Sequence, residues 1–224
     1  MTLTRRDFTS RLLGAGLTGA LPLAAGAQAA PVEGVSYIRL AQPAPTTAAG
    51  KIEVIEFFWY ECPHCNAFEP ALEAWAKRQP DDVALRRVPV WFREEPFSAQ
   101  QRLYYAIESM GLVPTLHRKV FRAIHGERVR IRTPEDIAAF ALKNGVDPVQ
   151  FIEAYNSFAV QAKSQQARQT ASAYKIDAVP AMGVNGRYYT NGILANATTP
   201  GGPNDNMLAV VDALIAKARQ TSRA

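Results

Sequence analysis

The sequence contains only two cysteines, Cys62 and Cys65, and two residues separate them. Two thiols so close in the chain can close a disulfide and exchange it with other thiols. Closing so short a loop removes little conformational entropy from an unfolded chain, so the bridge would be a weak cross-link. The spacing therefore indicates a redox-active pair, with a purely structural disulfide as the alternative.

The residues around the pair favour a reactive thiolate at Cys62. Cys62 follows a strand-like run and takes the position of a helix N-cap, while Pro63 suits the first helical position because its missing N–H costs nothing there. The backbone N–H groups of His64 and Cys65 and the positive end of the helix dipole then lower the pKa of the Cys62 thiol. His64 can add a donor or a positive charge, and Cys65, one turn further in, is expected to be better shielded.

Half of a zinc site is another interpretation of two cysteines at this spacing. Zinc takes four ligands in structural sites, and the remaining donors would be His117, His125 and a carboxylate at no standard spacing. We therefore expect no metal and no cofactor. His117 and His125 are predicted to be solvated surface residues.

The surrounding sequence predicts the elements that position the pair. Residues 51–60 form an apolar run typical of a strand buried on both faces, and residues 83–90 form a second strand candidate. A helix between them begins near Pro63, with a kink expected at Pro70 and an end at Pro80. Helices follow to about residue 174, strands return at 181–184 and 187–189 around an Asn-Gly hairpin signal, and an amphipathic helix over 206–219 closes the chain.

The N-terminal segment 1–29 reads as a secretory signal peptide. A basic stretch with paired arginines, Arg5 and Arg6, precedes a Gly- and Ala-rich apolar stretch and a small-x-small cleavage site at Ala27-Gln28-Ala29. The arginine pair also resembles a twin-arginine signal. A membrane anchor is the alternative, which four glycines and Pro22 within the segment disfavour. Export predicts a periplasmic protein in an oxidising compartment, where disulfides persist.

The charge balance excludes no enzyme class but argues against nucleic acid as a partner. The formal net charge is +5 for the whole chain, and part of it belongs to the signal segment. The basic side chains outside that segment do not form a track of phosphate ligands and are predicted to be solvated surface. They include Arg86, Arg87, Arg128, Arg130 and Arg132.

Two separated motifs resemble the DsbA family of bacterial periplasmic disulfide oxidases. Val54–Cys65 (VIEFFWYECPHC), followed by Phe68-Glu69, is similar to that family's active-site segment. Val179-Pro180-Ala181-Met182, followed by Val184-Asn185-Gly186, is similar to its cis-proline loop and hairpin. The resemblance implies an α/β fold, a thioredoxin fold with an inserted helical domain, in which residues 30–92 and 169–224 form the thioredoxin-like part and residues 93–168 the insertion.

The resemblance also implies roles for individual residues. Cys62 would be the exposed nucleophile and Cys65 its buried partner, with Pro63 and His64 as the dipeptide that tunes them. Pro180 would follow Val179 through a cis bond and lie against the disulfide. Glu56 would be a buried acid beneath it, and its burial is independently expected from its place in the strand. Arg87, where the family often has lysine, is a candidate partner for Glu56, and a purely structural ion pair is the alternative.

The predicted function is that of a monomeric dithiol oxidase. Its disulfide would pass to reduced or unfolded secreted polypeptides, whose backbone could pair with the chain near Val179. The resemblance implies reoxidation by a quinone-linked membrane partner of the DsbB type. A reductase or isomerase using the same residues remains open, as does a peptide-binding chaperone that needs neither cysteine.

Overall fold

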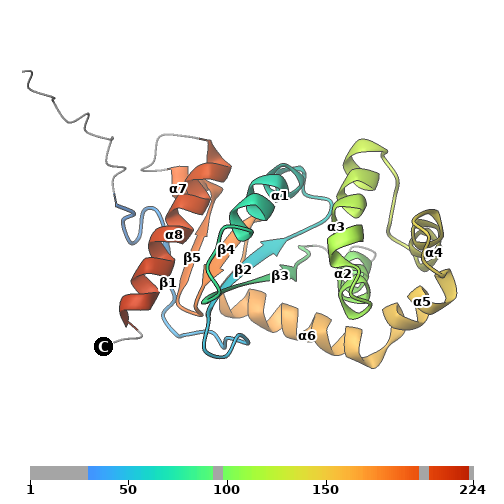
Figure 1. Cartoon of the computed structure of the whole chain (residues 1–224), viewed down its shortest axis with the longest axis horizontal. Coiled ribbons are helices and arrows are strands. Elements are labelled where there is room, and N and C mark those ends of the chain that lie inside the picture. Colours follow the sequence, from blue (N-terminus) through green and yellow to red (C-terminus); the bar gives the residue numbers. More distant parts are fainter. Residues whose placement is uncertain (1–29, 93–97, 197–201, 222–224) are drawn as a thin grey trace, which may run out of the picture.

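The computed structural model describes residues 30–92, 98–196 and 202–221, and it shows a mixed sheet beside a block of helices (Figure 1). The five strands are ordered β1-β5-β4-β2-β3. The strands are β1 (Ile38–Arg39), β2 (Ile52–Phe58), β3 (Val83–Pro89), β4 (Ala181–Val184) and β5 (Tyr188–Asn191). The helices are α1 (Pro63–Ala76), α2 (Ala99–Ser109), α3 (Val113–Phe121), α4 (Pro134–Lys143), α5 (Pro148–Asn156), α6 (Phe158–Ala173), α7 (Gly192–Asn196) and α8 (Pro203–Thr221).

The central β-α-β unit agrees with the sequence-based prediction. All seven residues of β2 are buried, and β2 pairs in parallel with β3, which places Glu56 opposite Arg87. The crossover between them is α1, which contains Pro70 and ends at Ala76, before the expected stop at Pro80. The unit brings the end of β2 and the start of α1 together at one edge of the sheet.

The second half of the sheet comes from the C-terminal part of the chain. Strand β4 pairs antiparallel with β2 and with β5, through a hairpin in which Asn185 and Gly186 have φ values of 51° and 64°. Both values lie in the left-handed region that such two-residue turns require. A Cβ on Gly186 would lie 2.2 Å from the carbonyl oxygen of Ala44, so a side chain would also collide there. Strand β1, which the sequence analysis did not predict, pairs with β5.

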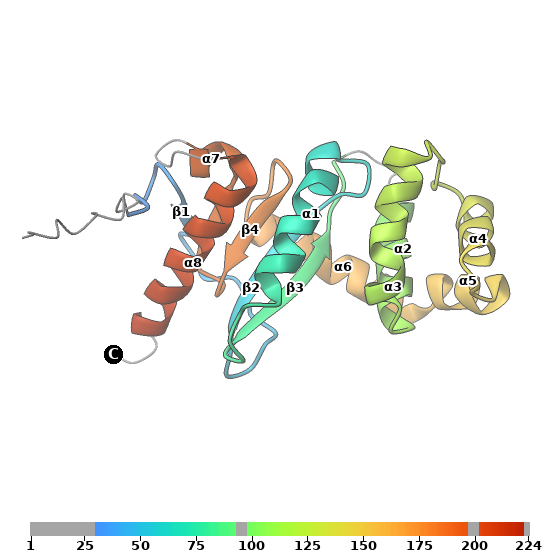
Figure 2. The ribbon, with the colours of Figure 1, turned by 45° about the horizontal axis from the view of Figure 1, so that its top comes forward.

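Helices cover both faces of the sheet, and the alternation along β2 separates the two cores. Val54 packs with α1 and α8, whereas Ile55 and Phe57 pack with residues of α2, α6 and the segment that follows α6. Figure 2 shows α1 and α8 in front of the sheet and α6 behind β3. The strand is therefore shielded on both faces, as its apolar run predicted.

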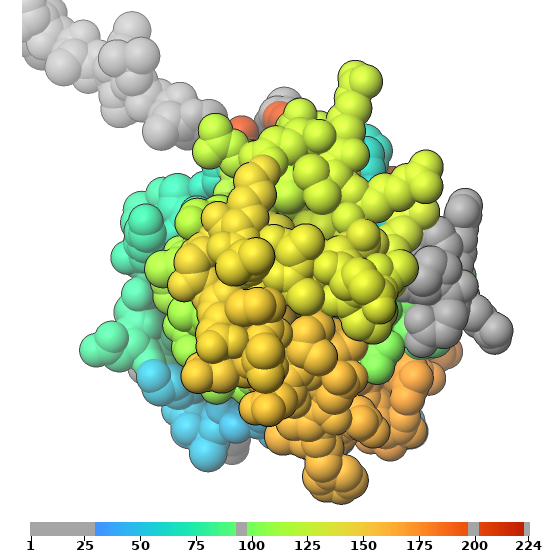
Figure 3. All heavy atoms as spheres, turned by 90° about the vertical axis from the view of Figure 1, so that its right-hand side faces the viewer, coloured from blue at the N-terminus to red at the C-terminus, as the bar shows by residue number. Residues whose placement is uncertain are grey.

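The helical block consists of α2 to α6 and a π-helical turn, Arg122–Gly126, that continues α3. Thr133 caps α4 through a capping box with Asp136, and the Asp147 side chain caps α5, both at predicted helix starts. Figure 3, viewed from this side, shows the helices of the block covering most of that face. The expected domain boundary at residue 168 falls within α6, which runs unbroken from the block to the sheet.

The predicted signal peptide, residues 1–29, lies outside the described residues. Among the helices that the structure does describe, none combines the length and apolar character needed to cross a bilayer.

Candidate active site

Cys62 lies between the end of β2 and the first turn of α1. It is the N-cap residue of α1, with extended backbone angles (φ −80°, ψ 115°) and Pro63 as the first helical residue. Its N–H donates to the carbonyl oxygen of Trp59 at 3.0 Å, and its own carbonyl accepts from Asn66 N–H at 3.2 Å. Both cysteines are free, so the structure is that of the dithiol form. Pro63 and His64 are exposed on the outer side of this turn.

The two thiols have opposite acidities. The pKa of Cys62 is lowered from 9.0 to about 6, first by the Cys65 thiol and then by the backbone N–H groups of Cys65 and His64 and the charge of His64, against the effect of burial. Burial raises the pKa of Cys65 well above its usual range, and the neighbouring Cys62 thiolate raises it further. Cys65 is 0% exposed, whereas Cys62 is 8% exposed. Cys62 is therefore the thiolate and the accessible sulfur of the pair.

Alkylation of the reduced protein should report this asymmetry. We expect iodoacetamide to modify Cys62 alone, with a rate that rises through an inflection near pH 6, because only the thiolate reacts. A Cys65→Ala variant should move the inflection to higher pH, since it removes the hydrogen bond from the Cys65 side chain, which is the first cause of the lowered pKa. Brief labelling at several pH values followed by mass spectrometry measures both. An inflection near 8.5, as for a free cysteine, would contradict the lowered pKa.

The loop before β4 faces the cysteine pair. The bond between Val179 and Pro180 is cis, as expected from the resemblance. The carbonyl oxygen of Val179 lies 3.4 Å from the Cys62 sulfur. Both loop residues are partly exposed. The loop therefore presents a backbone edge next to the accessible sulfur.

Two carboxyl groups and one arginine are buried behind the pair. Glu56 on β2 is 0% exposed, and its Oε2 lies 3.1 Å from Arg87 Nε on β3. Arg87 Nη2 donates to Glu69 Oε2 at 2.9 Å, so its charge serves both carboxyl groups. Burial raises the pKa of Glu56 well above its usual range, and the adjacent Glu69 adds to this while Arg87 opposes it. Burial and Glu69 thus favour the neutral form of Glu56, and the predicted partner Arg87 does lie beside it.

The prediction that His117 and His125 are solvated surface residues is wrong. His117 is 2% exposed, and its Nε2 lies 2.7 Å from Glu69 Oε1. Its Nδ1 lies 2.8 Å from the Tyr60 hydroxyl. His125 is half-buried, with Nε2 2.8 Å from the carbonyl oxygen of Tyr60. Both rings therefore fix the segment that leads into Cys62.

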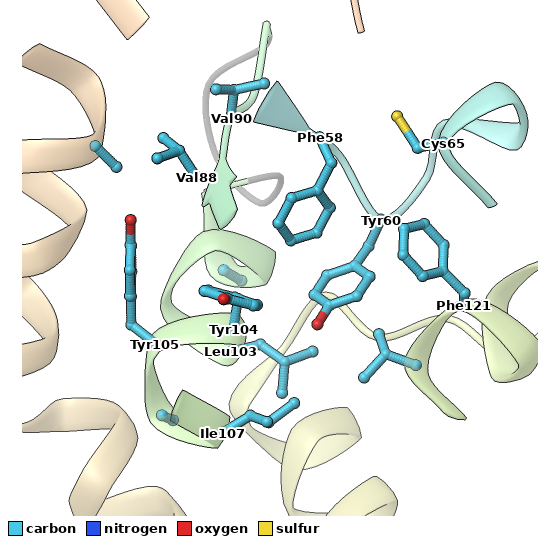
Figure 4. Packing of buried hydrophobic residues seen from close by; sticks show 14 of the residues in the cluster. Phe58, Tyr60, Cys65, Val88, Val90, Leu103, Tyr104, Tyr105, Ile107 and Phe121 are labelled. Atoms are coloured by element: carbon cyan, nitrogen blue, oxygen red, sulfur yellow. The ribbon is translucent and has the colours of Figure 1, made fainter. Parts of the chain in front are cut away.

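The packing around Tyr60 explains why these rings turn inward. Tyr60 and Phe121 pack with ring centroids 4.9 Å apart, and Figure 4 shows them side by side below the turn that carries Cys65. Phe58 packs against His117 edge-on at 5.1 Å. This aromatic cluster joins the end of β2 to α3.

Glu69 and His117 could have been found from their helical positions. Glu69 follows Phe68 and precedes Leu72 on the apolar face of α1, where a carboxylate is costly unless it is paired. His117 shares an apolar face of α3 with Val120 and Phe121. A polar residue on such a face indicates a buried partner, although its identity requires the tertiary structure.

Three of the arginines predicted to be solvated surface also form ion pairs. Arg87 contacts the two buried carboxyl groups. Arg86 donates two hydrogen bonds to the Glu53 carboxylate, both at 3.1 Å. Arg132 donates two hydrogen bonds, at 2.6 and 2.7 Å, to the carboxylate of Glu61, the residue before Cys62. The carboxylate nearest Cys62 in the sequence is thus neutralised. Within the described ranges, no three His, Cys, Asp or Glu side chains gather as a metal ion would need.

Comparisons with known proteins agree with this geometry. A family model described as a DSBA-like thioredoxin domain matches residues 53–201. The thiol:disulfide interchange protein DsbA of Azotobacter vinelandii is 41% identical, covering 93% of this chain and 97% of its own length. The DsbA of Bordetella pertussis is 43% identical, covering 94% and 97%.

Solved structures give the same result. The crystal structure of Pseudomonas aeruginosa DsbA has a TM-score of 0.79 at 39% identity, over 85% of this chain and 96% of that one. Reduced DsbA1 from Neisseria meningitidis has a TM-score of 0.74 at 28% identity, over 87% and 98%. The predicted fold, a thioredoxin fold with helices inserted into it, is confirmed, and the chain belongs to the family of DsbA-like thioredoxin-domain proteins.

Proposed function

We propose that this protein is a periplasmic dithiol oxidase that donates the Cys62–Cys65 disulfide to reduced secreted polypeptides. The observation that carries the proposal is the opposite acidity of two adjacent thiols, one accessible and one enclosed. A stabilised thiolate is a good leaving group, and its stability favours the dithiol over the disulfide. A centre built this way accepts electrons readily, which is the property of an oxidant.

The first step is attack by a client thiolate on the sulfur of Cys62, the accessible atom of the disulfide. The Cys62–Cys65 bond breaks and its electron pair passes to Cys65, while a mixed disulfide forms between Cys62 and the client. The departing Cys65 sulfur is buried and strongly favours its protonated form. It therefore needs a proton as it leaves.

The neutral carboxyl of Glu56 is the group we assign to that proton transfer. Its raised pKa favours the protonated form, and a negative charge on it would raise the pKa of Cys65 further. After Glu56 gives its proton to Cys65, exchange with solvent restores the acid. Glu56 thereby limits the build-up of negative charge in the buried site.

The second step releases the oxidised client. A second client thiolate attacks the client sulfur that is bonded to Cys62, a client disulfide forms, and the Cys62 thiolate departs. The N-terminus of α1, with His64 exposed beside it, favours this charged leaving group. The client loses two electrons and the protein is left as the dithiol.

Client binding is assigned to the loop that carries Val179 and Pro180. An extended segment can pair with backbone groups near Val179, 3.4 Å from Cys62, without reading side chains. We therefore propose broad specificity. Reoxidation is proposed to use a quinone-linked membrane oxidase of the DsbB type, with the protein acting as a monomer.

Export and domain organisation belong to the same proposal. Residues 1–29 would direct the chain to the periplasm. The Arg5-Arg6 pair resembles a twin-arginine signal, so export by that route is the alternative to test. The proposed division is 30–92 and 169–224 for the thioredoxin-like part and 93–168 for the insertion, with α6 spanning the second junction.

A redox equilibrium tests the function directly. The purified protein would be equilibrated with glutathione buffers of known ratio, and its dithiol fraction read by alkylation and mass spectrometry. An oxidase should be largely reduced under conditions that leave a stable structural disulfide intact. The oxidised protein should then convert a reduced, unfolded client to its disulfide form in stoichiometric amounts. A disulfide that resists reduction would favour a reductase instead.

A further inference from the structure

The mechanism above does not use His117, a titratable side chain that is 2% exposed. His117 on α3 lies between Tyr60 and Glu69, at 2.8 Å from the first and 2.7 Å from the second. Burial raises the pKa of Tyr60 well above its usual range, so the phenol keeps its proton and donates it to Nδ1. Burial also lowers the pKa of His117, so the ring is neutral and its remaining N–H is on Nε2. His117 therefore donates to Glu69.

This donation makes the two buried carboxyl groups unequal. Glu69 Oε1 accepts from His117 at 2.7 Å and from Arg87 Nε at 3.4 Å, and Oε2 accepts from Arg87 Nη2 at 2.9 Å. Glu56 has only the 3.1 Å ion-pair contact with Arg87, and neither of its oxygens has a well-aligned hydrogen bond among the described residues. Two carboxyl groups this close do not both ionise readily, so one retains a proton. Glu69, the carboxyl group that accepts more hydrogen bonds, therefore ionises first.

The acidities follow that inequality. Burial acts to raise the pKa of Glu69, but the hydrogen bond from His117 and the charge and hydrogen bond of Arg87 act to lower it, and the pKa lies below its usual range. The pKa of Glu56 moves the opposite way. The geometry alone gives the same order, because Glu69 has two aligned donors and Glu56 has none.

We propose that His117 is a positioning residue of the redox centre: by donating from Nε2 it keeps Glu69 ionised and leaves the shared proton on Glu56. This inference rests on the proposed function, in which Glu56 exchanges that proton with Cys65. Without the donation, Glu69 would take a share of the proton and Glu56 would carry negative charge near Cys65. The Cys65 sulfur would then be a poorer leaving group when the Cys62–Cys65 disulfide breaks. Its thiol would also lose a proton less easily in the reverse direction.

Other ionisable groups also face this network and enter its titration. They are Glu56 on β2, Arg87 on β3, Cys65, Glu69 and Glu73 on α1, Tyr104 on α2, and Tyr60 in the connecting segment. Arg87 is their cation. His117 and Tyr104 differ from the rest because they enter from α3 and α2, outside the β-α-β unit that carries the cysteines.

Two matched variants separate the proposed donation from simple packing. The side-chain amide of His117→Gln can reach Glu69 from the position of Nε2, whereas the shorter amide of His117→Asn occupies the position of Nδ1 and reaches only Tyr60. In the reduced protein with ¹³C-labelled glutamate side chains, carboxyl NMR at neutral pH should show one protonated buried glutamate, Glu56. His117→Asn should move the Glu69 signal towards its protonated position, and His117→Gln should restore most of the parent spectrum.

A kinetic measurement follows the consequence for Cys65. Cys62 is linked to a chromogenic aryl thiol, and release of that thiol reports attack by Cys65 as a function of pH. We expect the inflection in His117→Asn to move about one unit higher, with a rate about tenfold lower at neutral pH. Alkylation of Cys62 should keep its inflection near 6 in both variants, because Cys65 and His64 set its pKa.

Three outcomes would overturn the assignment. These are parent-like carboxyl signals in His117→Asn, an unchanged Cys65 profile, or equal effects of the two variants, which would mark His117 as a packing residue. If His117→Asn does not fold, Glu69→Gln provides the second test, because removing the competing carboxylate should let Glu56 ionise beside Arg87, and a Glu56 that stays protonated would refute the coupling. A parent protein that fails to oxidise clients would refute the proposed function, while the carboxyl signals would still decide the role of His117.

Discussion

Replacing Cys62 by serine is expected to abolish catalysed oxidation of reduced clients. The variant cannot form the Cys62–Cys65 disulfide, and the sulfur that remains, Cys65, is 0% exposed with its pKa raised well above the usual range. A buried thiol is a poor nucleophile because so little of it is ionised. Regain of activity by a reduced, disulfide-containing client measures the effect, with uncatalysed air oxidation as the baseline.

The same variant decides between an oxidase and a chaperone. A chaperone that binds extended polypeptides near Val179 needs neither cysteine, so Cys62→Ser would still suppress client aggregation and support recovery. His64→Gln is the matched control, because His64 is an exposed neighbour of Cys62 and leaves both sulfurs in place. It should retain turnover, with Cys62 somewhat less acidic because the electrostatic contribution of His64 to its lowered pKa is lost. Parent-like oxidation by Cys62→Ser would refute the proposed chemistry.

The difference in unfolding free energy between the reduced and the oxidised protein should depend strongly on pH. The pKa of Cys62 falls from 9.0 to about 6 in the folded dithiol, so its thiolate stabilises the reduced fold fully above pH 9 and not at all below about pH 6. Between these values the stabilisation grows by up to about 1.4 kcal/mol per pH unit, an upper limit because solvent screens this partly exposed site. Cys65 does not alter this window, since its pKa is raised above it.

The oxidised form has no thiolate, and its disulfide closes a very short loop. Such a loop contributes only about 2 kcal/mol of stability. We therefore expect the two forms to be equally stable at about pH 7.5, where the thiolate stabilisation reaches the disulfide's contribution of about 2 kcal/mol, with the reduced protein the more stable form above that pH and the oxidised protein below it. Denaturant unfolding of both forms at three pH values measures this. The reduced Cys62→Ala variant should lack the pH-dependent stabilisation by the Cys62 thiolate. A difference in unfolding free energy between the two redox forms that does not vary with pH would show that the pKa of Cys62 is not lowered.

The elements that hold the cysteines could be predicted because their signals are local. The apolar run of β2, Pro63 at the start of α1, the Asn185-Gly186 hairpin and the Thr133 cap each depend on residues that are neighbours in the chain. Burial of Glu56 followed from its place within a strand enclosed on both faces. The position of Pro180 came from the resemblance and agrees with the structure.

The parts that were missed depend on contacts between distant segments. His117 meets Glu69 across 48 positions of sequence, and no local pattern pairs them. Strand β1 has only two residues and owes its place to β5, far along the chain. The turn from Arg122 is π-helical rather than a simple continuation of α3, and the sequence periodicity gave no indication of it. In each case a tertiary partner determines the local conformation.

The order of strands in the sheet has a consequence for biosynthesis. The central strand β2 lies between β3, which follows it closely, and β4, which begins at Ala181, and β1 pairs only with β5. A nascent chain that ends before residue 179 therefore has one open edge on β2 and lacks the Val179–Pro180 segment of the loop that faces Cys62. The reactive cysteine is made in the first third of translation, but its binding site is completed only when the last strands arrive.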